Sequence, residues 1–146
     1  MNNTNLLTSL NTYISSFAVA SVNTKVYHWL ITGDNFFVLH EKFEELYNYY
    51  TETQDKIAER VRALDSDPEI GFSHYLQNSK IKETILKNNE NLILDEVVNT
   101  LDLLITFGHE VKKSADDIED KETHDFIVVI IFELQKYRWM YKSQNA

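Results

Sequence analysis

The sequence predicts an all-α fold, a four-helix bundle with one short extra helix, and three observations lead to that expectation. Apolar residues recur at steps of three and four along four long stretches, which is the spacing of amphipathic helices. Only 3 glycines and 1 proline interrupt the chain. The hydrophobic content of 43% and the length of 146 residues suit one domain, residues 1–146, with a sizeable core.

The first predicted helix begins at Thr4 or Asn5, and its apolar stripe fades towards its C-terminal end. Gly33 is expected to stop it as the residue just after its cap, because glycine tolerates the left-handed backbone conformation found there. Asp34 or Asn35 is then expected to cap the second helix. Such a short connection makes the first two helices antiparallel neighbours.

The second predicted helix covers about residues 35–64 and ends at a break that contains Pro68. The stretch from there to about residue 91 is irregular, apart from a short helix at residues 72–77. A connection of this length permits a crossover from one end of the bundle to the other. The last two helices are expected at about residues 92–117 and 123–141.

Composition limits the function. The chain carries 23 acidic and 14 basic residues, a net charge of −9, so it repels phosphate backbones and attracts cations. It has no cysteine, so a metal site must use histidine and carboxylate ligands, which suit iron, manganese or zinc. The N-terminus resembles no secretory signal, and the longest apolar run, residues 126–132, is too short to cross a bilayer. We therefore expect a soluble, cytoplasmic protein that makes no membrane contact.

The second predicted helix carries the residues around which the function is organised. At 100° per residue, His40, Glu44, Asp55 and Glu59 fall within an arc of about 100°. The apolar residues form a separate band on another face of the same helix. They are Leu39, Phe43, Leu46, Tyr50, Ile57, Val61 and Leu64. One face therefore packs into the core, and the other gathers metal-ligand chemistry.

The spacing along this helix predicts a site shared between two chains. The pairs His40/Glu44 and Asp55/Glu59 are centred about 22 Å apart, too far to hold one ion within a single chain. A second copy lying antiparallel about a two-fold axis would set each pair against the other pair of its partner. His28, near the end of the first helix, would add a second imidazole. The alternatives are an ordinary packed histidine and a solvated acidic face.

The residues around these ligands carry a recognisable pattern. It runs Lys25-x-x-His28-Trp29-x-x-x-Gly33-x-x-Phe36-x-x-Leu39-His40-Glu41-x-Phe43-x-x-x-Tyr47, followed by Asp55-x-x-Ala58-Glu59-Arg60. This pattern closely resembles the signature of the Dps family, the miniferritins. A weaker likeness continues in Asp120-x-x-Thr123-x-Asp125 and Lys136-x-x-Trp139-Met140.

The resemblance implies a ferritin-like bundle that assembles into a hollow dodecamer. Such an assembly would oxidise Fe(II) with hydrogen peroxide or O2, store the ferric mineral and protect against oxidative damage. His28, His40 and Glu44 of one subunit and Asp55 and Glu59 of its partner would form the ferroxidase site. Zinc or another divalent ion could take the place of iron.

Two positions depart from the family pattern. Glu44 stands where the family usually has aspartate, which lengthens the carboxylate arm by one methylene and leaves its mode of binding open. Leu30 stands where many members have a polar residue after the tryptophan, which changes the wetness of the pocket without removing a ligand.

Further acidic residues are candidates for secondary roles. One group lies where the family places its three-fold iron pores: Asp116, Asp117, Asp120 and Asp125. The alternative is that Thr123 and Asp125 cap the helix and compensate its dipole, which would also explain acidic residues at a helix start. Glu41, Glu45 and Glu52 flank the ligand stripe and would nucleate mineral, or form a plain solvated face. Trp29 and Tyr47 are candidates to carry oxidising equivalents, or ordinary core aromatics.

Two rival functions remain open on the sequence. One is a DNA-compacting structural protein with little or no iron chemistry. Its weakness is that the segment before the first helix contains no basic residue and the segment after Tyr141 contains only Lys142, so we expect no unaided DNA binding. The other rival is a purely structural bundle that has lost its iron chemistry.

Overall fold

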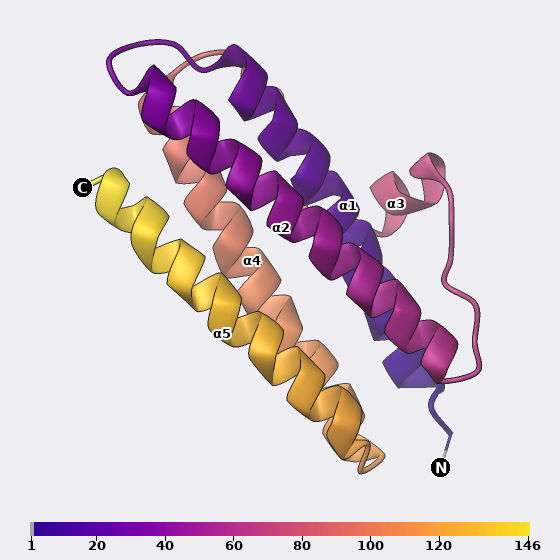
Figure 1. Cartoon of the computed structure of the whole chain (residues 1–146). Helices are drawn as coiled ribbons and strands as arrows, with labels where there is room; N and C mark the ends of the chain where they lie inside the picture. The colour runs from indigo at the N-terminus through magenta and orange to yellow at the C-terminus, as the bar shows by residue number, and fades with distance from the viewer. Residues whose placement is uncertain (1) are drawn as a thin grey trace.

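The structure, a computed structural model, describes residues 2–146, which form five helices and no strand. The helices are α1 (Thr4–Leu30), α2 (Phe36–Ala63), α3 (Phe72–Asn78), α4 (Glu90–Asp117) and α5 (Lys121–Gln144). The four long helices pack side by side as a bundle, and the short α3 lies outside it against α1 (Figure 1). The predicted all-α fold, with its extra helix between the second and third long helices, is confirmed.

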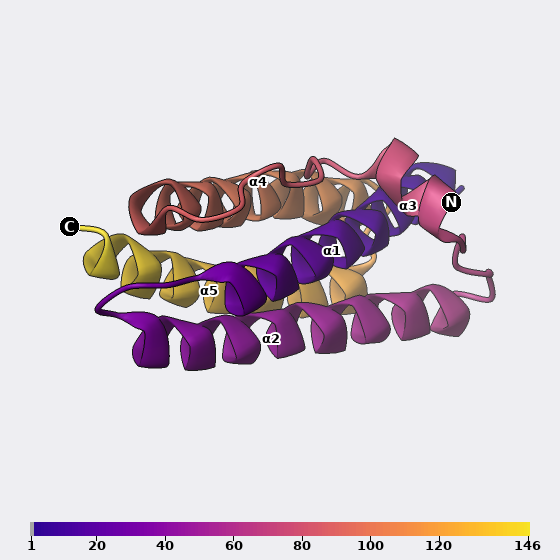
Figure 2. The ribbon, with the colours of Figure 1, turned by 90° about the horizontal axis from the view of Figure 1, so that it is seen from above.

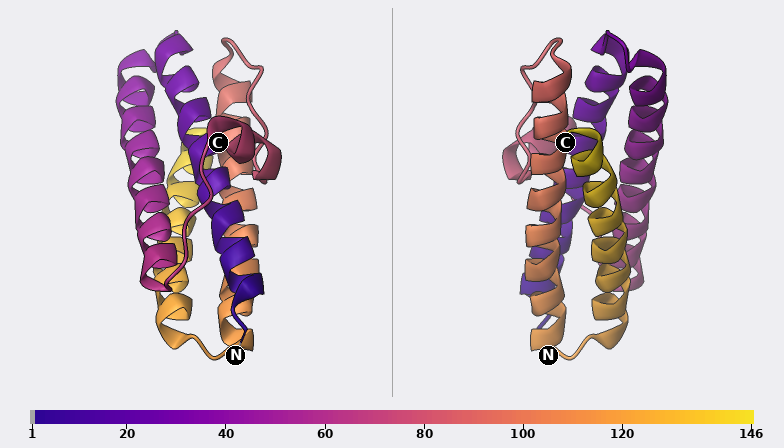
Figure 3. Two further views of the ribbon diagram at one scale, coloured as in Figure 1. Left: turned by 90° about the vertical axis from the view of Figure 1, so that its right-hand side faces the viewer. Right: turned by 90° about the vertical axis from the view of Figure 1, so that its left-hand side faces the viewer.

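The long helices form two antiparallel pairs, α1 with α2 and α4 with α5, each joined by a short turn (Figure 1). The segment between α2 and α4 instead returns along the whole length of the bundle, as Figures 2 and 3 show. This crossover makes α2 and α4 run in the same direction. The long irregular stretch in the sequence is therefore a crossover, as its length permits.

Polar side chains of α1 hold the crossover in place. Asn11 and Ser16 each accept a hydrogen bond from a backbone amide of the crossover, at 2.8 and 2.9 Å. Asn23 binds twice, accepting from the Thr84 amide at 3.0 Å and donating to the Lys82 carbonyl at 2.8 Å. Backbone groups without secondary structure need such partners when they lie against a helix. This explains why α1 buries Asn11, Ser16 and Asn23.

The core is apolar and rich in aromatic rings. The face of α2 that the sequence predicted to pack is buried at Leu39, Phe43, Leu46, Tyr50, Ile57 and Val61, while Leu64 is partly buried. Gly108 of α4 allows a close approach, since a Cβ there would lie 2.7 Å from the Tyr13 hydroxyl and 2.9 Å from Ile131. That hydroxyl donates to the Leu104 carbonyl at 2.9 Å, so the tyrosine is buried without loss of its hydrogen bond.

The turn between α1 and α2 differs from the prediction in two details. The C-terminal cap of α1 is Ile31, so Gly33 lies two residues after the cap and not directly after it. Its φ of +112° is a conformation that glycine adopts readily, and it lies within the turn that reverses the chain. Asn35 occupies the cap position of α2, yet its side chain does not cap the helix. Its amide donates instead to the carboxylate of Glu90, at 3.1 Å, and so ties the start of α2 to the start of α4.

Among the helices of residues 2–146, none combines the length and the apolar character that crossing a bilayer requires.

Candidate metal centre

His28 and His40 lie face to face where α1 ends and α2 begins. Their rings are stacked, with centroids 3.7 Å apart and planes 11° apart. Each ring binds the backbone of the other residue: Nδ1 of His28 lies 2.5 Å from the His40 carbonyl oxygen, and Nδ1 of His40 lies 2.7 Å from the His28 carbonyl oxygen. The five-residue turn between the helices brings the two residues together.

These reciprocal bonds determine the chemistry of both rings. A carbonyl oxygen only accepts, so each Nδ1 carries a hydrogen. In the neutral form of the ring, the lone pair is then on Nε2, the atom that a metal ion would bind. A histidine whose Nδ1–H is held by a carbonyl is the usual form of a metal ligand. The carbonyl of His28 is also one of the last four of α1, which have no partner within the helix. His40 therefore also serves as a C-terminal cap of α1.

Tyr47 connects the histidines to the first carboxylate. Its ring meets the His28 ring edge-on, with centroids 5.4 Å apart, and its hydroxyl donates to Oε1 of Glu44 at 3.3 Å. Partial burial and then the negative charge of Glu44 raise the pKa of Tyr47, so the phenol keeps its proton and remains a donor. We call His28, His40 and Glu44 the imidazole half-site.

Asp55 and Glu59 form the second group of ligands, which we call the acid half-site. They lie one turn apart near the C-terminal end of α2, with both side chains exposed. The pKa of Glu59 is raised above its ordinary value, first by a hydrogen bond shared with Asp55 and then by repulsion from the Asp55 charge. Glu59 thus holds a proton more readily than a free glutamate, and a cation bound at this pair would compete with that proton.

A single chain does not bring the two half-sites together. The pairs His40/Glu44 and Asp55/Glu59 lie on α2 with about 22 Å between their centres, and His28 of α1 lies beside the first pair. Within residues 2–146 no three or more histidine, aspartate or glutamate side chains approach closely enough to hold an ion. Each half-site presents ligands of the kind that divalent first-row metals bind, imidazole nitrogen on one side and carboxylate oxygen on the other. The half-sites are thus matched in chemistry and separate in space.

The candidate pore residues cluster where α4 ends and α5 begins. Asp120 caps α5: its carboxylate accepts from the Thr123 amide at 3.0 Å, from the Thr123 hydroxyl at 2.6 Å and from Arg60 of α2 at 3.5 Å. Burial alone would raise the pKa of Asp120, but these hydrogen bonds and the Arg60 charge outweigh it and lower the pKa. The predicted capping role thus falls to Asp120, rather than to Thr123 and Asp125.

His124 is a polar residue of this cluster that the sequence interpretation passed over. Its Nδ1 lies 3.0 Å from Asp125, and its Nε2 lies 3.7 Å from Asp116. The signal in the sequence was a histidine inside an acidic segment. Asp117 pairs with Lys113 at 3.1 Å instead. Asp116 and Asp125 are therefore the carboxylates of this end that share one imidazole.

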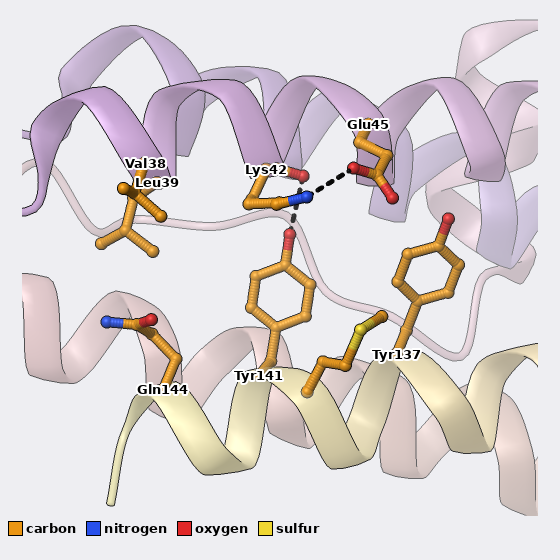
Figure 4. A pocket seen from close by; sticks show the side chains of 8 residues that line it. Val38, Leu39, Lys42, Glu45, Tyr137, Tyr141 and Gln144 are labelled. Carbon is orange, nitrogen blue, oxygen red and sulfur yellow. Dashed lines mark hydrogen bonds and ion pairs between the residues drawn. The ribbon is translucent and has the colours of Figure 1, made fainter.

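The candidate nucleation residues differ in their exposure and in their ion pairs. Glu41 and Glu52 are exposed on α2. Glu45 pairs with Lys42 at 3.1 Å and lines a groove of about 150 Å³ between α2 and α5 (Figure 4). In the same groove the Tyr141 hydroxyl donates to the Lys42 carbonyl at 2.7 Å and fastens the end of α5 to α2. Trp29 is 65% exposed, so it is not a core aromatic of this chain.

Comparisons with known proteins agree with this arrangement. Residues 7–146 match the family described as a ferritin-like domain. The chain is 30% identical over 141 residues to DNA protection during starvation protein 2 of Bacillus anthracis, covering 97% of both proteins. It superposes on a Dps protein from Bacillus brevis with a TM-score of 0.95 and 29% identity over the full length of both chains.

A third relative is described in chemical terms. The chain superposes on the Dps protein of Vibrio cholerae O1 with a TM-score of 0.93 and 30% identity. That protein is described as a member of a broad superfamily of ferritin-like diiron-carboxylate proteins. The match covers 99% of the present chain and 91% of the Vibrio chain. Fold and sequence likeness thus agree over almost the whole length. The chain belongs to the ferritin-like family and, within it, to the Dps miniferritins.

Proposed function

We propose that this protein is a ferroxidase and iron-storage miniferritin whose catalytic site forms between two copies of the chain. The observation that carries the proposal is the division of one ligand set into two half-sites at opposite ends of α2, with His28 of α1 beside the first. Each half-site holds too few ligands alone, and their chemistry is complementary. A two-fold axis crossing α2 near Tyr49 and Tyr50 would pair the imidazole half-site of one subunit with the acid half-site of the other.

The surface beside α2 supports such a contact. A groove of about 450 Å³ lies between α1, α2 and α3. Its lining includes the large apolar side chains Val22, Phe72 and Leu76, which are 50%, 83% and 52% exposed. Apolar side chains gathered at one surface are typical of protein interfaces. A second copy of the chain must lie against α2 to complete the metal site. Such a copy would also cover this apolar groove, so it is the occupant that we propose.

The residues divide the chemistry between them. His28 and His40 would offer neutral Nε2 atoms, which suit ferrous iron, while Glu44, Asp55 and Glu59 would supply negative charge that favours the ferric product. Two ferrous ions side by side could each give one electron to the same hydrogen peroxide, and two protons would complete two waters. Transfer of both electrons together would limit the release of hydroxyl radical. The protein contributes positioning and charge compensation.

The wider assembly follows from the same proposal. A hollow dodecamer would store the ferric mineral, with Asp116, Asp120 and Asp125 around its pores and Glu41 and Glu45 facing the mineral. Asp120 would act there mainly through its hold on Arg60 and Thr123, because its oxygens already accept those hydrogen bonds. Zinc or another divalent ion would compete for the same ligands. We place the protein in the cytoplasm.

A complementation experiment tests the shared site. One variant, His28→Ala/His40→Ala, lacks imidazoles, and a second, Asp55→Ala/Glu59→Ala, lacks acids. Each alone is expected to lose most of its Fe(II) oxidation with hydrogen peroxide. When the two are co-expressed with different tags and purified together, each mixed dimer regains one intact site and up to about half of the wild-type rate. Absence of any recovery in mixed dimers of the correct mass would refute the shared site.

DNA compaction is the second candidate, and the name of the Bacillus anthracis relative favours it. The present chain opposes it through its net charge of −9. A gel-shift experiment at low salt separates the two functions. We expect no retardation of DNA without added divalent ions, and tight binding under those conditions would support the DNA-compacting function.

A further inference from the structure

Tyr47 holds a position that the proposed ferroxidase function does not by itself explain. It follows His40 by seven residues and Glu44 by three, so the three side chains lie along one face of α2. Two residues of α1 fix its ring. His28 meets it edge-on at 5.4 Å, and the Lys25 ammonium lies over its face, 5.5 Å from the ring centroid.

The position of the Tyr47 ring determines that its hydroxyl reaches Glu44. Because the ring is held from α1, the hydroxyl has a defined place beside the imidazole half-site, where it donates to Oε1 of Glu44 at 3.3 Å. Glu44 is exposed, and a free glutamate side chain on a helix surface samples many rotamers. The Tyr47 hydroxyl restricts that freedom and keeps the carboxylate beside the ring that contacts His28.

The length of the Glu44 side chain is essential to this contact. An aspartate at position 44 would draw the carboxylate back by about one carbon–carbon bond, roughly 1.5 Å. Since the contact is already 3.3 Å long, the shorter side chain would fall outside hydrogen-bonding distance of Tyr47. In this chain, the extra methylene of Glu44 is therefore what lets its carboxylate accept the Tyr47 hydrogen bond.

We propose that Tyr47 is a positioning residue that orients Glu44 as a metal ligand of the imidazole half-site. The inference rests on the proposed function, because it assigns Glu44 to the same site. Tyr47 does not touch the metal; it acts through the carboxylate. Partners that orient a ligand in this way commonly change metal affinity by about 10–100-fold when removed. For a single exposed hydrogen bond we expect the low end of that range, about ten-fold.

Binding of Co(II) to the complete assembled protein tests the inference without relying on turnover. Tyr47→Phe retains the ring and its contacts with His28 and Lys25 and loses only the hydroxyl. We expect the Co(II) dissociation constant to rise about ten-fold and the visible cobalt spectrum to change as one carboxylate ligand is displaced. Tyr137→Phe is the matched control. It removes a hydroxyl from α5, where the ring packs on Tyr49, and should leave both measurements unchanged.

A double-mutant cycle identifies the carboxylate through which the hydroxyl acts. In a Glu44→Asp background, Tyr47→Phe should change the Co(II) dissociation constant less than about two-fold, since the aspartate no longer reaches the hydroxyl. An equal loss of affinity in both backgrounds would overturn the inference, because the hydroxyl would then act independently of Glu44. An unchanged affinity and spectrum for Tyr47→Phe in the wild-type background would overturn it as well.

The two proposals fail in different ways. If wild-type protein and Tyr137→Phe bind no Co(II), the proposed function is wrong, and this inference falls with it. If wild-type protein binds Co(II) and passes the complementation experiment while Tyr47→Phe behaves like wild type, only the inference is overturned. Thermal unfolding of each variant, followed by circular dichroism, verifies that the proteins compared are folded.

Discussion

The imidazole half-site and the acid half-site differ in how folding prepares them. In the imidazole half-site, His28 is only 8% exposed, and the two rings are stacked and bonded to each other's backbone. In the acid half-site, Asp55 and Glu59 are exposed, and the pKa of Glu59 is raised first by the hydrogen bond that it shares with Asp55 and then by repulsion from the Asp55 charge. The first is ordered by folding itself. The second is unfavourable until something compensates its charge.

This contrast indicates how each half-site would serve a shared centre. A ligand group that is already ordered loses little entropy when it binds an ion, so the imidazole half-site supplies geometry. A pair of repelling carboxylates gains most when a cation arrives, so the acid half-site supplies electrostatic attraction. Joining two chains head to tail would combine these contributions twice in one dimer.

The largest expected effect comes from removing the charge of the acid half-site. Asp55→Asn/Glu59→Gln keeps side-chain size but abolishes the attraction for a cation, so the initial rate of Fe(II) oxidation by hydrogen peroxide should fall more than about 100-fold. The rate is followed by ferric absorbance. The control Glu110→Gln/Glu122→Gln neutralises two exposed carboxylates on α4 and α5 and should retain the wild-type rate. A similar loss in both double variants would mean that general acidity, not the acid half-site, drives the reaction.

A smaller effect distinguishes the half-sites by stability. His40→Ala removes the ring that caps the His28 carbonyl and stacks on His28, so the metal-free protein should lose about 1 kcal/mol of unfolding free energy. Asp55→Asn relieves repulsion and should leave that free energy unchanged or raise it slightly. Urea unfolding with a chelator, at one protein concentration, measures both. Equal destabilisation by both substitutions would contradict the view that only the imidazole half-site is ordered by folding.

The sequence predicted the parts of the molecule that depend on periodicity. The buried face of α2, the order of the long helices and the crossover all follow from apolar spacing and from the single proline, and the structure confirms them. The same spacing placed His40, Glu44, Asp55 and Glu59 on one stripe. That they form one centre with His28 stays a prediction, because it concerns a second chain.

The apolar periodicity of the sequence does not predict contacts between segments that are distant in the chain. Asn35 looked like a helix cap, but its amide reaches Glu90, 55 residues away. Polar residues of α1 such as Asn23 gave no local signal of their role, yet they bind the crossover. The reciprocal bonds of His28 and His40 also depend on how the turn folds back. Each case involves a polar group whose partner is chosen by tertiary structure rather than by local propensity.

The smallest effect is a dependence of stability on pH that has opposite signs at two carboxylates. Glu59 has a pKa raised above 4.5, so the folded protein keeps a proton that the unfolded chain releases, and its stability should fall as pH rises through the interval just above 4.5. Glu59→Gln should flatten that part of the metal-free stability curve, measured as the urea midpoint from pH 4.5 to 7. Asp120 is the contrasting case: its pKa is lowered below 3.8, so its stabilisation is present above 3.8 and is lost as pH falls through the lowered value. Asp120→Asn should therefore lower the midpoint at pH 7 and make less difference in acid. If Glu59→Gln steepened the curve instead, the acid pair would be stabilised in the folded chain, and the half-site would not depend on a cation for its balance.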